Sequence, residues 1–170
     1  GAVFLSPHPA DAQGFNLQYI QGIGSFHTFD QFLRLTYGND HWQMSTRAVY
    51  SFSDNDFKYK NYNKKMNIYD DDHNIIGSYY PVERNKSCDF NDLHLLQEVY
   101  YNTGKGHRFG LSAWYLDSRR GIPMLSVDQK DDSEFINEQK EHTFRGSLSW
   151  DRTSGDLKTS VKAGYIHTEL

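Results

Sequence analysis

The sequence predicts an all-β fold, an antiparallel up-and-down meander of about seven long strands, and three observations support it. Side chains alternate between two columns along each candidate strand, and the charges fall consistently on one of the two. Short turns alternate with long polar connections, and aromatic residues of the uncharged columns gather beside the short turns. A charge-free column with an aromatic rim is what a lipid-facing strand requires, so we expect a segment of a large transmembrane β-barrel.

The stretch 28–53 shows the pattern most clearly. It reads as strands Thr28–Tyr37 and His41–Ser53, joined by a turn at Gly38-Asn39-Asp40, which are residue types that tolerate short hairpin loops. One face of this hairpin carries no charge and the other carries every charge. Tyr37 and Trp42 lie on the uncharged face beside the turn, as aromatic residues do at a membrane interface.

The same alternation predicts five further strands. They are Asn16–Ser25, Leu93–Asn102, His107–Asp117, His142–Asp151 and Leu157–Thr168. Short turns are expected at 103–106 and 152–156, and long excursions at 54–90 and 118–139. Within the first excursion, 64–69 and 75–80 predict a smaller hairpin that rises above the sheet.

Composition excludes several classes of protein. No run of about 18 apolar residues occurs, so a helical membrane protein is excluded. The net charge of -4 leaves no basic patch, so nucleic acid is not an expected partner. No nucleophile elbow, P-loop or dinucleotide-binding glycine pattern is present, and we expect no enzyme activity.

Short motifs along the chain resemble those of one family. Gly1–Leu5 looks like the last strand of a plug domain, and Gly22–Thr28 looks like a first barrel hairpin of the form G-x-G-S-F-G-T, with His27 where glycine is usual. The stretches 91–103, 117–132 and 142–150 look like its third to sixth barrel strands. In this order, the motifs resemble TonB-dependent outer-membrane receptors, which are plugged β-barrels.

The resemblance implies a domain organisation, a location and partners. Residues 1–14 would be the last plug strand and a linker, and residues 15–170 the first third of the barrel with its extracellular loops. The chain would sit in the bacterial outer membrane, against lipid, lipopolysaccharide and its own plug, and depend on the TonB energy-coupling system. Its function would be import of a bulky scarce nutrient, a small-molecule ligand such as cobalamin, an iron-siderophore or haem.

Ligand-binding candidates lie in the predicted loops. Arg119 and Arg120 could hold a phosphate or carboxylate of the ligand, or pair with loop carboxylates or lipopolysaccharide phosphates. Loop tyrosines could stack on a planar macrocycle, or pack the loop against its neighbour. These tyrosines are Tyr62, Tyr69, Tyr79 and Tyr80.

Acidic clusters in the same loops suggest calcium, which takes six to eight oxygen ligands. The candidate ligands are Asp54, Asp56, Asp70, Asp71 and Asp72, with Asp128–Asp132 as a further cluster. Their spacing does not match an EF-hand, and acidic loops of this kind are more commonly solvated turns.

Charged side chains of the other column would face the lumen and the plug in a complete barrel, or line a solvated channel wall. They are Arg34, Arg47, Glu98, Arg108, Arg145, Lys158 and Lys162. The alternative fold is a soluble β-sandwich that buries the uncharged face against a second sheet and binds carbohydrate through surface aromatics.

Overall fold

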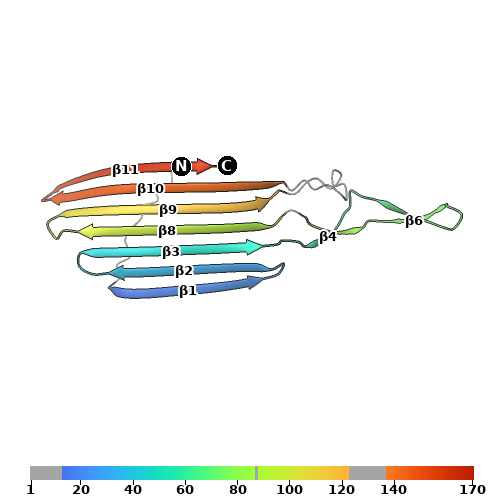
Figure 1. Ribbon diagram of the computed structural model, residues 1–170, viewed down its shortest axis with the longest axis horizontal. Helices are drawn as coiled ribbons and strands as arrows, with labels where there is room; N and C mark the ends of the chain where they lie inside the picture. The colour runs from blue at the N-terminus through green and yellow to red at the C-terminus, as the bar shows by residue number, and fades with distance from the viewer. Residues whose placement is uncertain (1–12, 87, 123–136) are drawn as a thin grey trace.

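The computed structural model describes residues 13–86, 88–122 and 137–170, and a single large antiparallel sheet dominates it (Figure 1). Its strands, in spatial order, are β1 (Gly14–Gly24), β2 (Thr28–Gly38), β3 (Trp42–Ser53), β8 (Phe90–Asn102), β9 (His107–Gly121), β10 (Glu138–Ser154) and β11 (Leu157–Glu169). Spatial order follows chain order, so the predicted all-β meander of seven strands is confirmed. The proposed plug strand at residues 1–5 and the acidic cluster 128–132 lie outside the described residues.

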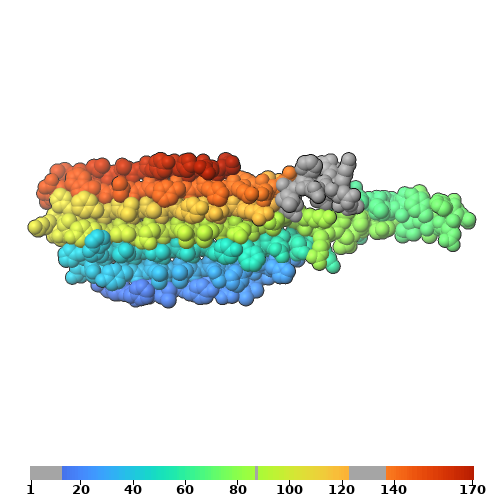
Figure 2. Space-filling model, viewed as in Figure 1, coloured from blue at the N-terminus to red at the C-terminus, as the bar shows by residue number. Residues whose placement is uncertain are grey.

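An extension projects beyond one end of the sheet, between the end of β3 and the start of β8 (Figures 1 and 2). At its base β4 (Lys58–Lys60) pairs with β7 (Val82–Arg84), and further out β5 (Met66–Tyr69) pairs with β6 (Ile75–Tyr79). The smaller hairpin predicted within 54–90 is therefore confirmed, whereas the β4–β7 ladder has no counterpart in the sequence-based prediction.

The turn between β2 and β3 shows why the strands fold back where they do. The side-chain oxygen Oδ1 of Asn39 accepts hydrogen bonds from the backbone N–H of His41 at 2.9 Å and of Trp42 at 2.7 Å. The Asn39 side chain thus gives a hydrogen-bond acceptor to two backbone N–H groups at the end of the β2–β3 ladder. The turn sets the register in which Gly38 lies opposite Gln43.

Glycine is required at the β8–β9 turn. Gly106 has a φ of 80°, and a Cβ added there would lie 2.3 Å from the backbone oxygen of Thr153. The backbone of Thr153 also donates to the Gly106 carbonyl at 2.8 Å. Two neighbouring hairpins are thus joined at the same end of the sheet.

The β1–β2 turn lies at the opposite end and is tight. Phe26 and His27 both have left-handed backbone conformations, with φ of 60° and 54°. The carbonyl of Phe26 accepts hydrogen bonds from the Asp54 N–H at 3.1 Å and the Ser53 hydroxyl at 3.1 Å. The turn therefore packs against the end of β3.

Connection lengths differ between the two ends of the sheet. The three turns at the Gly38 end are short, and the connections 54–89 and 122–137 at the other end are long. The β1–β2 turn is an exception, because it is short yet lies at the end with the long connections.

Three predicted loop boundaries are wrong, one in the excursion 54–90 and both in the excursion 118–139. β9 continues to Gly121 and β10 begins at Glu138, so residues 118–121 and 138–139 are strand rather than part of an excursion; likewise, β8 begins at Phe90. The strands run on because polar side chains beyond the apolar region still pair across the ladder.

The distribution of burial is inverted relative to a soluble domain. No hydrophobic residue is buried in the described part of the chain, and apart from Gly38 and Gly110 the buried residues are all polar or charged. The strands form one layer, and no described element packs as a second sheet against either face. Among the described residues, no helix is long and apolar enough to cross a membrane.

Candidate functional site

The first candidate surface is the face of the sheet that we call the apolar face. Strand pairing places the uncharged columns of neighbouring strands directly opposite one another, as in the series Met44, Val99, Leu111 and Leu148. Many of these side chains are open to the surroundings: Leu148 is 59% exposed and Leu17 57% exposed. The predicted uncharged face is therefore continuous across all seven strands.

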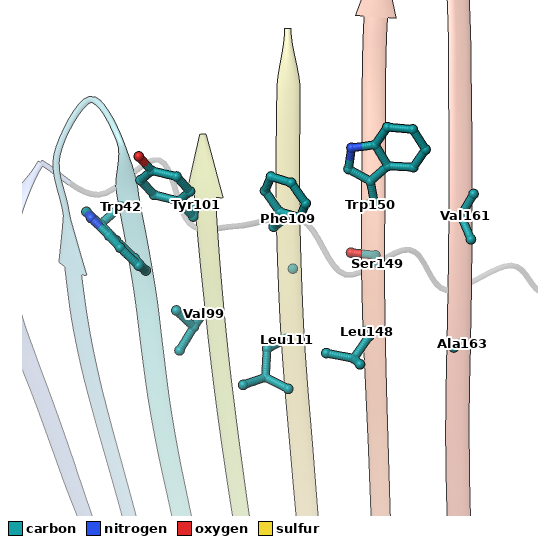
Figure 3. A pocket seen from close by; sticks show the side chains of 11 residues that line it. Trp42, Val99, Tyr101, Phe109, Leu111, Leu148, Ser149, Trp150, Val161 and Ala163 are labelled. Carbon is teal, nitrogen blue, oxygen red and sulfur yellow. The ribbon is translucent and has the colours of Figure 1, made fainter. Parts of the chain in front are cut away.

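An aromatic row borders the apolar face beside the short turns. Trp42, Tyr101, Phe109 and Trp150 are successive cross-strand partners (Figure 3). The rings of Trp42 and Tyr101 lie 4.5 Å apart, and the indole N–H of Trp150 donates to Nδ1 of His107 at 3.2 Å. A row of amphipathic rings at one level is the arrangement found where a barrel wall meets the membrane interface.

The other border of the apolar face also carries aromatic residues. On β9 and β10, Tyr115 lies opposite Phe144, and the ring of Phe144 is 6.4 Å from that of Tyr165. Charged residues follow immediately, because Asp117 is the next residue of this column on β9 and accepts a 3.5 Å hydrogen bond from the hydroxyl of Tyr115. Aromatic residues thus border the apolar face toward both ends of the strands.

The polar side chains inside the apolar face have partners. The hydroxyl of Thr46 donates to Oε1 of Gln97 at 2.6 Å, and Nε2 of Gln97 donates to the carbonyl of Glu98 at 3.2 Å. On β1 and β2, the Tyr19 hydroxyl bonds to both Gln21 and Gln31. Pairing of this kind lowers the cost of placing polar groups in a medium without water.

A shallow apolar hollow of about 450 Å³ lies between the aromatic row and the row below it (Figure 3). Its floor and walls include Val99, Leu111, Leu148 and Ala163. The hollow lacks convergent polar groups, so it has none of the features that orient a polar substrate.

The opposite face, which we call the polar face, carries all seven side chains predicted to face a lumen or plug. Register places Arg34 opposite Arg47, Arg108 opposite Asp151 and Lys162 opposite Ser149. Glu98 is only 4% exposed and forms an ion pair with Arg47 at 3.2 Å. The hydroxyl of Tyr100 donates to the same carboxylate at 3.3 Å.

Two further arginines of the polar face lie over aromatic rings. The guanidinium of Arg145 lies 4.4 Å from the ring centre of Trp114, and that of Arg108 lies 4.8 Å from the ring centre of Tyr100. A guanidinium over a ring face is attracted by the negative charge density of that face.

Sequence reasoning missed an apolar strip within the polar face. It runs across the middle of the sheet and consists of Ile20, Phe32, Val49, Leu96, Trp114 and Leu116. Sorting the columns by charge concealed it, because these residues share a column with the charges. Their spacing in the sequence is the signal that could have revealed them.

Arg119 and Arg120 do not form one ligand clamp. They are consecutive residues of β9 and point to opposite faces. Nε of Arg119 donates to Glu138 at 2.7 Å, and Nη2 of Arg120 donates to Asp92 at 3.1 Å. Of the two predicted roles, carboxylate pairing is the one observed, although the carboxylates belong to strands rather than to loops.

The four candidate tyrosines separate into two groups on the extension. Tyr62 and Tyr80 approach with ring centres 5.4 Å apart, and Nζ of Lys60 lies 5.6 Å from one ring centre and 6.0 Å from the other. Tyr69 and Tyr79 belong to the outer hairpin and are 56% and 49% exposed. Lys60 is a contributor that the sequence did not indicate.

The base of the extension is held by a polar network around Glu83. The side-chain amide of Asn61 donates to Glu83 at 2.9 Å, and Nζ of Lys64 lies 3.2 Å from the same carboxylate. The Asn61 hydrogen bond first, and the Lys64 hydrogen bond next, hold the pKa of Glu83 below its ordinary value.

The five candidate calcium ligands are not brought together. Asp54 contacts His27, Asp56 pairs with Arg84, and Asp70 accepts the backbone N–H groups of Asp72 and Asn74 within its own turn. Asp71 lies in that turn as well. In the described ranges no group of three or more acidic, histidine or cysteine side chains could hold a metal ion, and calcium stays a prediction from the sequence.

Comparison with known proteins gives no assignment. No protein-family model matches the chain, and no curated protein matches it.

Proposed function

We propose that the chain forms part of the wall of an outer-membrane β-barrel, in a receptor of the TonB-dependent type that imports a bulky scarce nutrient. In this proposal the apolar face contacts lipid, the polar face contacts the lumen and plug, and the extension projects outside the cell. The short sequence motifs resemble that family, and the exposed apolar face and unpaired edges of the sheet support a barrel wall.

The exposed apolar face is the observation that carries the proposal. A sheet of 11- to 17-residue strands without a buried apolar residue cannot be stabilised in water by the hydrophobic effect. In a bilayer the same face would contact hydrocarbon, and the two aromatic borders would correspond to the aromatic girdles of a barrel at the membrane interfaces. Strands of this length suffice to cross the hydrocarbon region when tilted.

The unpaired sheet edges support a larger closed structure. Within the described residues, β1 pairs only with β2, and β11 pairs only with β10. Each outer edge therefore presents free backbone N–H and C=O groups, which lipid cannot satisfy. Additional strands that close the barrel would satisfy them, as in the large plugged transporters.

The extension supports ligand capture on the side of the long connections. It presents aromatic rings, a lysine ammonium over two of them, and exposed aliphatic residues such as Ile75 and Ile76. Aromatic and aliphatic surfaces of this kind suit a bulky, partly planar nutrient. No contact in the described part of the chain favours the carbohydrate-binding sandwich, and we do not propose it.

Lipid contact is tested with neighbouring residues that point to opposite faces. In a Cys88→Ser background, Leu111→Cys and Ser112→Cys are labelled with the same fluorophore and reconstituted into vesicles. We expect nitroxide-labelled lipids to quench the label at position 111 and leave that at position 112 largely unaffected, since Leu111 belongs to the apolar face and Ser112 to the polar face.

Equal quenching at both positions by aqueous iodide, with none by lipid nitroxide, would contradict the proposal. Transport itself is tested by deleting the gene from the bacterium that carries it. Loss of growth on one limiting source among cobalamin, ferric siderophore and haem, restored by the full-length gene, would support import. Unchanged growth and uptake for all three would contradict import of these nutrients while leaving the lipid-contact result intact.

A further inference from the structure

The polar face contains two arginines that lie directly opposite each other on neighbouring strands. Arg34 of β2 and Arg47 of β3 are direct cross-strand partners. Residues in this relationship have Cβ atoms about 4.5–5.5 Å apart, and like charges so placed destabilise a sheet. An arrangement of this kind requires a compensating negative charge.

Glu98 supplies only part of that charge. Its carboxylate pairs with Arg47 at 3.2 Å and accepts the Tyr100 hydroxyl at 3.3 Å. Nε of Arg34 is shielded from solvent and has no hydrogen-bond partner in the structure. A buried donor without a partner costs free energy and points to a missing acceptor, such as an ion.

A neighbouring hydroxyl, that of Ser45, also lacks a hydrogen-bond partner. Oγ of Ser45, two residues before Arg47 on the same face of β3, is also shielded from solvent and lacks a partner. A hydroxyl can donate to an oxyanion alongside two guanidinium groups. Gln43 Oε1, further along the strand, is an orphaned acceptor and would bind a water or the ligand's own hydroxyl rather than the anion.

The charge around this pair would attract an anion. From the Arg34–Arg47 row to the short turns, the described polar face carries six cationic side chains and two acidic ones. The cationic side chains are Arg34, Arg47, Arg108, Arg145, Lys158 and Lys162, and the acidic ones are Glu98 and Asp151. Toward the long connections the balance reverses, with Asp30, Asp92 and Glu141 against Arg120. A net positive charge of this kind raises the local concentration of anions.

We propose that Arg34, Arg47 and Ser45 form an oxyanion site on the polar face, which binds a carboxylate or phosphate group. The planar guanidinium fork matches both groups in a bidentate manner. The group could belong to a free anionic ligand or to an acidic side chain of a segment that covers this face. The site depends on the β2–β3 register and does not depend on lipid contact or transport.

The test follows the side-chain Nε–H signal of Arg34 by NMR in the full chain in detergent micelles. Inorganic phosphate, succinate and a blocked Ala-Glu-Ala peptide are titrated at constant ionic strength. We expect a saturable shift of this signal, and at least a tenfold weaker affinity in Ser45→Ala or Arg47→Lys. The Arg34→Gln variant removes the signal, so its affinity is measured by calorimetry and is expected to fall at least tenfold.

Arg145→Gln is the matched control, because it removes an equal charge from the same face and lies three strands away from Arg47. It is expected to bind within twofold of the unmodified chain. Saturation by the free anions identifies a small anionic ligand, and saturation by the peptide alone identifies an acidic segment; both support the site. A non-saturating response to all three probes, or equal weakening by Arg145→Gln and Arg34→Gln, would overturn it.

Discussion

Nδ1 of His27 lies 2.5 Å from Oδ2 of Asp54, so a turn between the first two strands is joined to the residue that follows β3. His27 achieves this with a φ of 54°, a backbone conformation in which an L-residue with a Cβ is disfavoured. In this chain the contact with Asp54 offsets part of the backbone cost.

The first prediction separates these two contributions. His27→Gly should raise the free energy of unfolding by about 0.5–1 kcal/mol, because relief of the left-handed backbone outweighs an exposed pair. Asp54→Ala should lower it by about 0.5 kcal/mol, because only the exposed pair is lost. Denaturant unfolding from lipid vesicles measures both. A destabilised His27→Gly variant would mean that the side-chain contact dominates.

The second prediction concerns the apolar face. Leu111→Arg should lower the free energy of unfolding by about 2 kcal/mol in vesicles, since a cation on the lipid side of a barrel wall loses hydration. Ser112→Arg places the same side chain on the polar face and should change it by less than about 0.5 kcal/mol. Equal costs for the two variants would be inconsistent with lipid on one side only.

The third prediction couples Glu98 to Arg34. Glu98→Gln should destabilise the fold by about 1–3 kcal/mol, because Arg47 loses its ion pair while it still lies opposite Arg34. Adding Arg34→Gln should recover part of this loss, since one of the two like charges is then absent. A double-mutant cycle measures the interaction energy between Glu98 and Arg34, and simple additivity would show that these two side chains do not influence each other.

The fourth prediction is a pH dependence of the extension. The pKa of Glu83 is lower in the folded chain than in the unfolded one, so the carboxylate stabilises the fold above the unfolded pKa, about 4.3. That contribution is lost as the pH falls from this value through the lower folded pKa. Amide hydrogen exchange of β4 and β7 should therefore accelerate below about pH 4, after correction for intrinsic exchange.

Glu83→Gln provides the control for this experiment. It keeps the shape of the side chain and removes its titration, so its exchange rates should not show the additional acceleration. If the variant and the unmodified chain respond alike, another group governs the extension in acid.

The seven strands could be predicted because charged and apolar residues alternate with the two-residue period of a strand. This alternation is visible within each segment of the sequence and needs no knowledge of neighbouring strands. It failed at the strand ends, where Arg119 and Glu138 resemble loop residues until a neighbouring strand supplies each with a partner. Charged residues continue a ladder wherever they pair across it, and a single strand does not reveal its neighbour.

The candidate sites were harder to predict than the faces. Arg34 lies opposite Arg47 because of the register that the Asn39 turn sets. The alternation of side chains along each strand does not determine this register. The pairing of Arg47 with Glu98 spans the whole of the extension in sequence, since β3 and β8 are neighbours only in space. Local patterns carry no information about such a contact.

The adjacency of β3 and β8 has a consequence for how proteins of this kind can diversify. The extension leaves the sheet from β3 and returns to β8 beside it (Figure 1). The pairing of β3 with β8, as at Trp42 and Tyr101, therefore does not depend on the length or composition of the extension. Replacement of residues 57–85 by an unrelated hairpin leaves every backbone pair of the wall in place. Under the proposed function, selection could therefore change the captured compound at this position while the seven-stranded sheet is inherited unchanged.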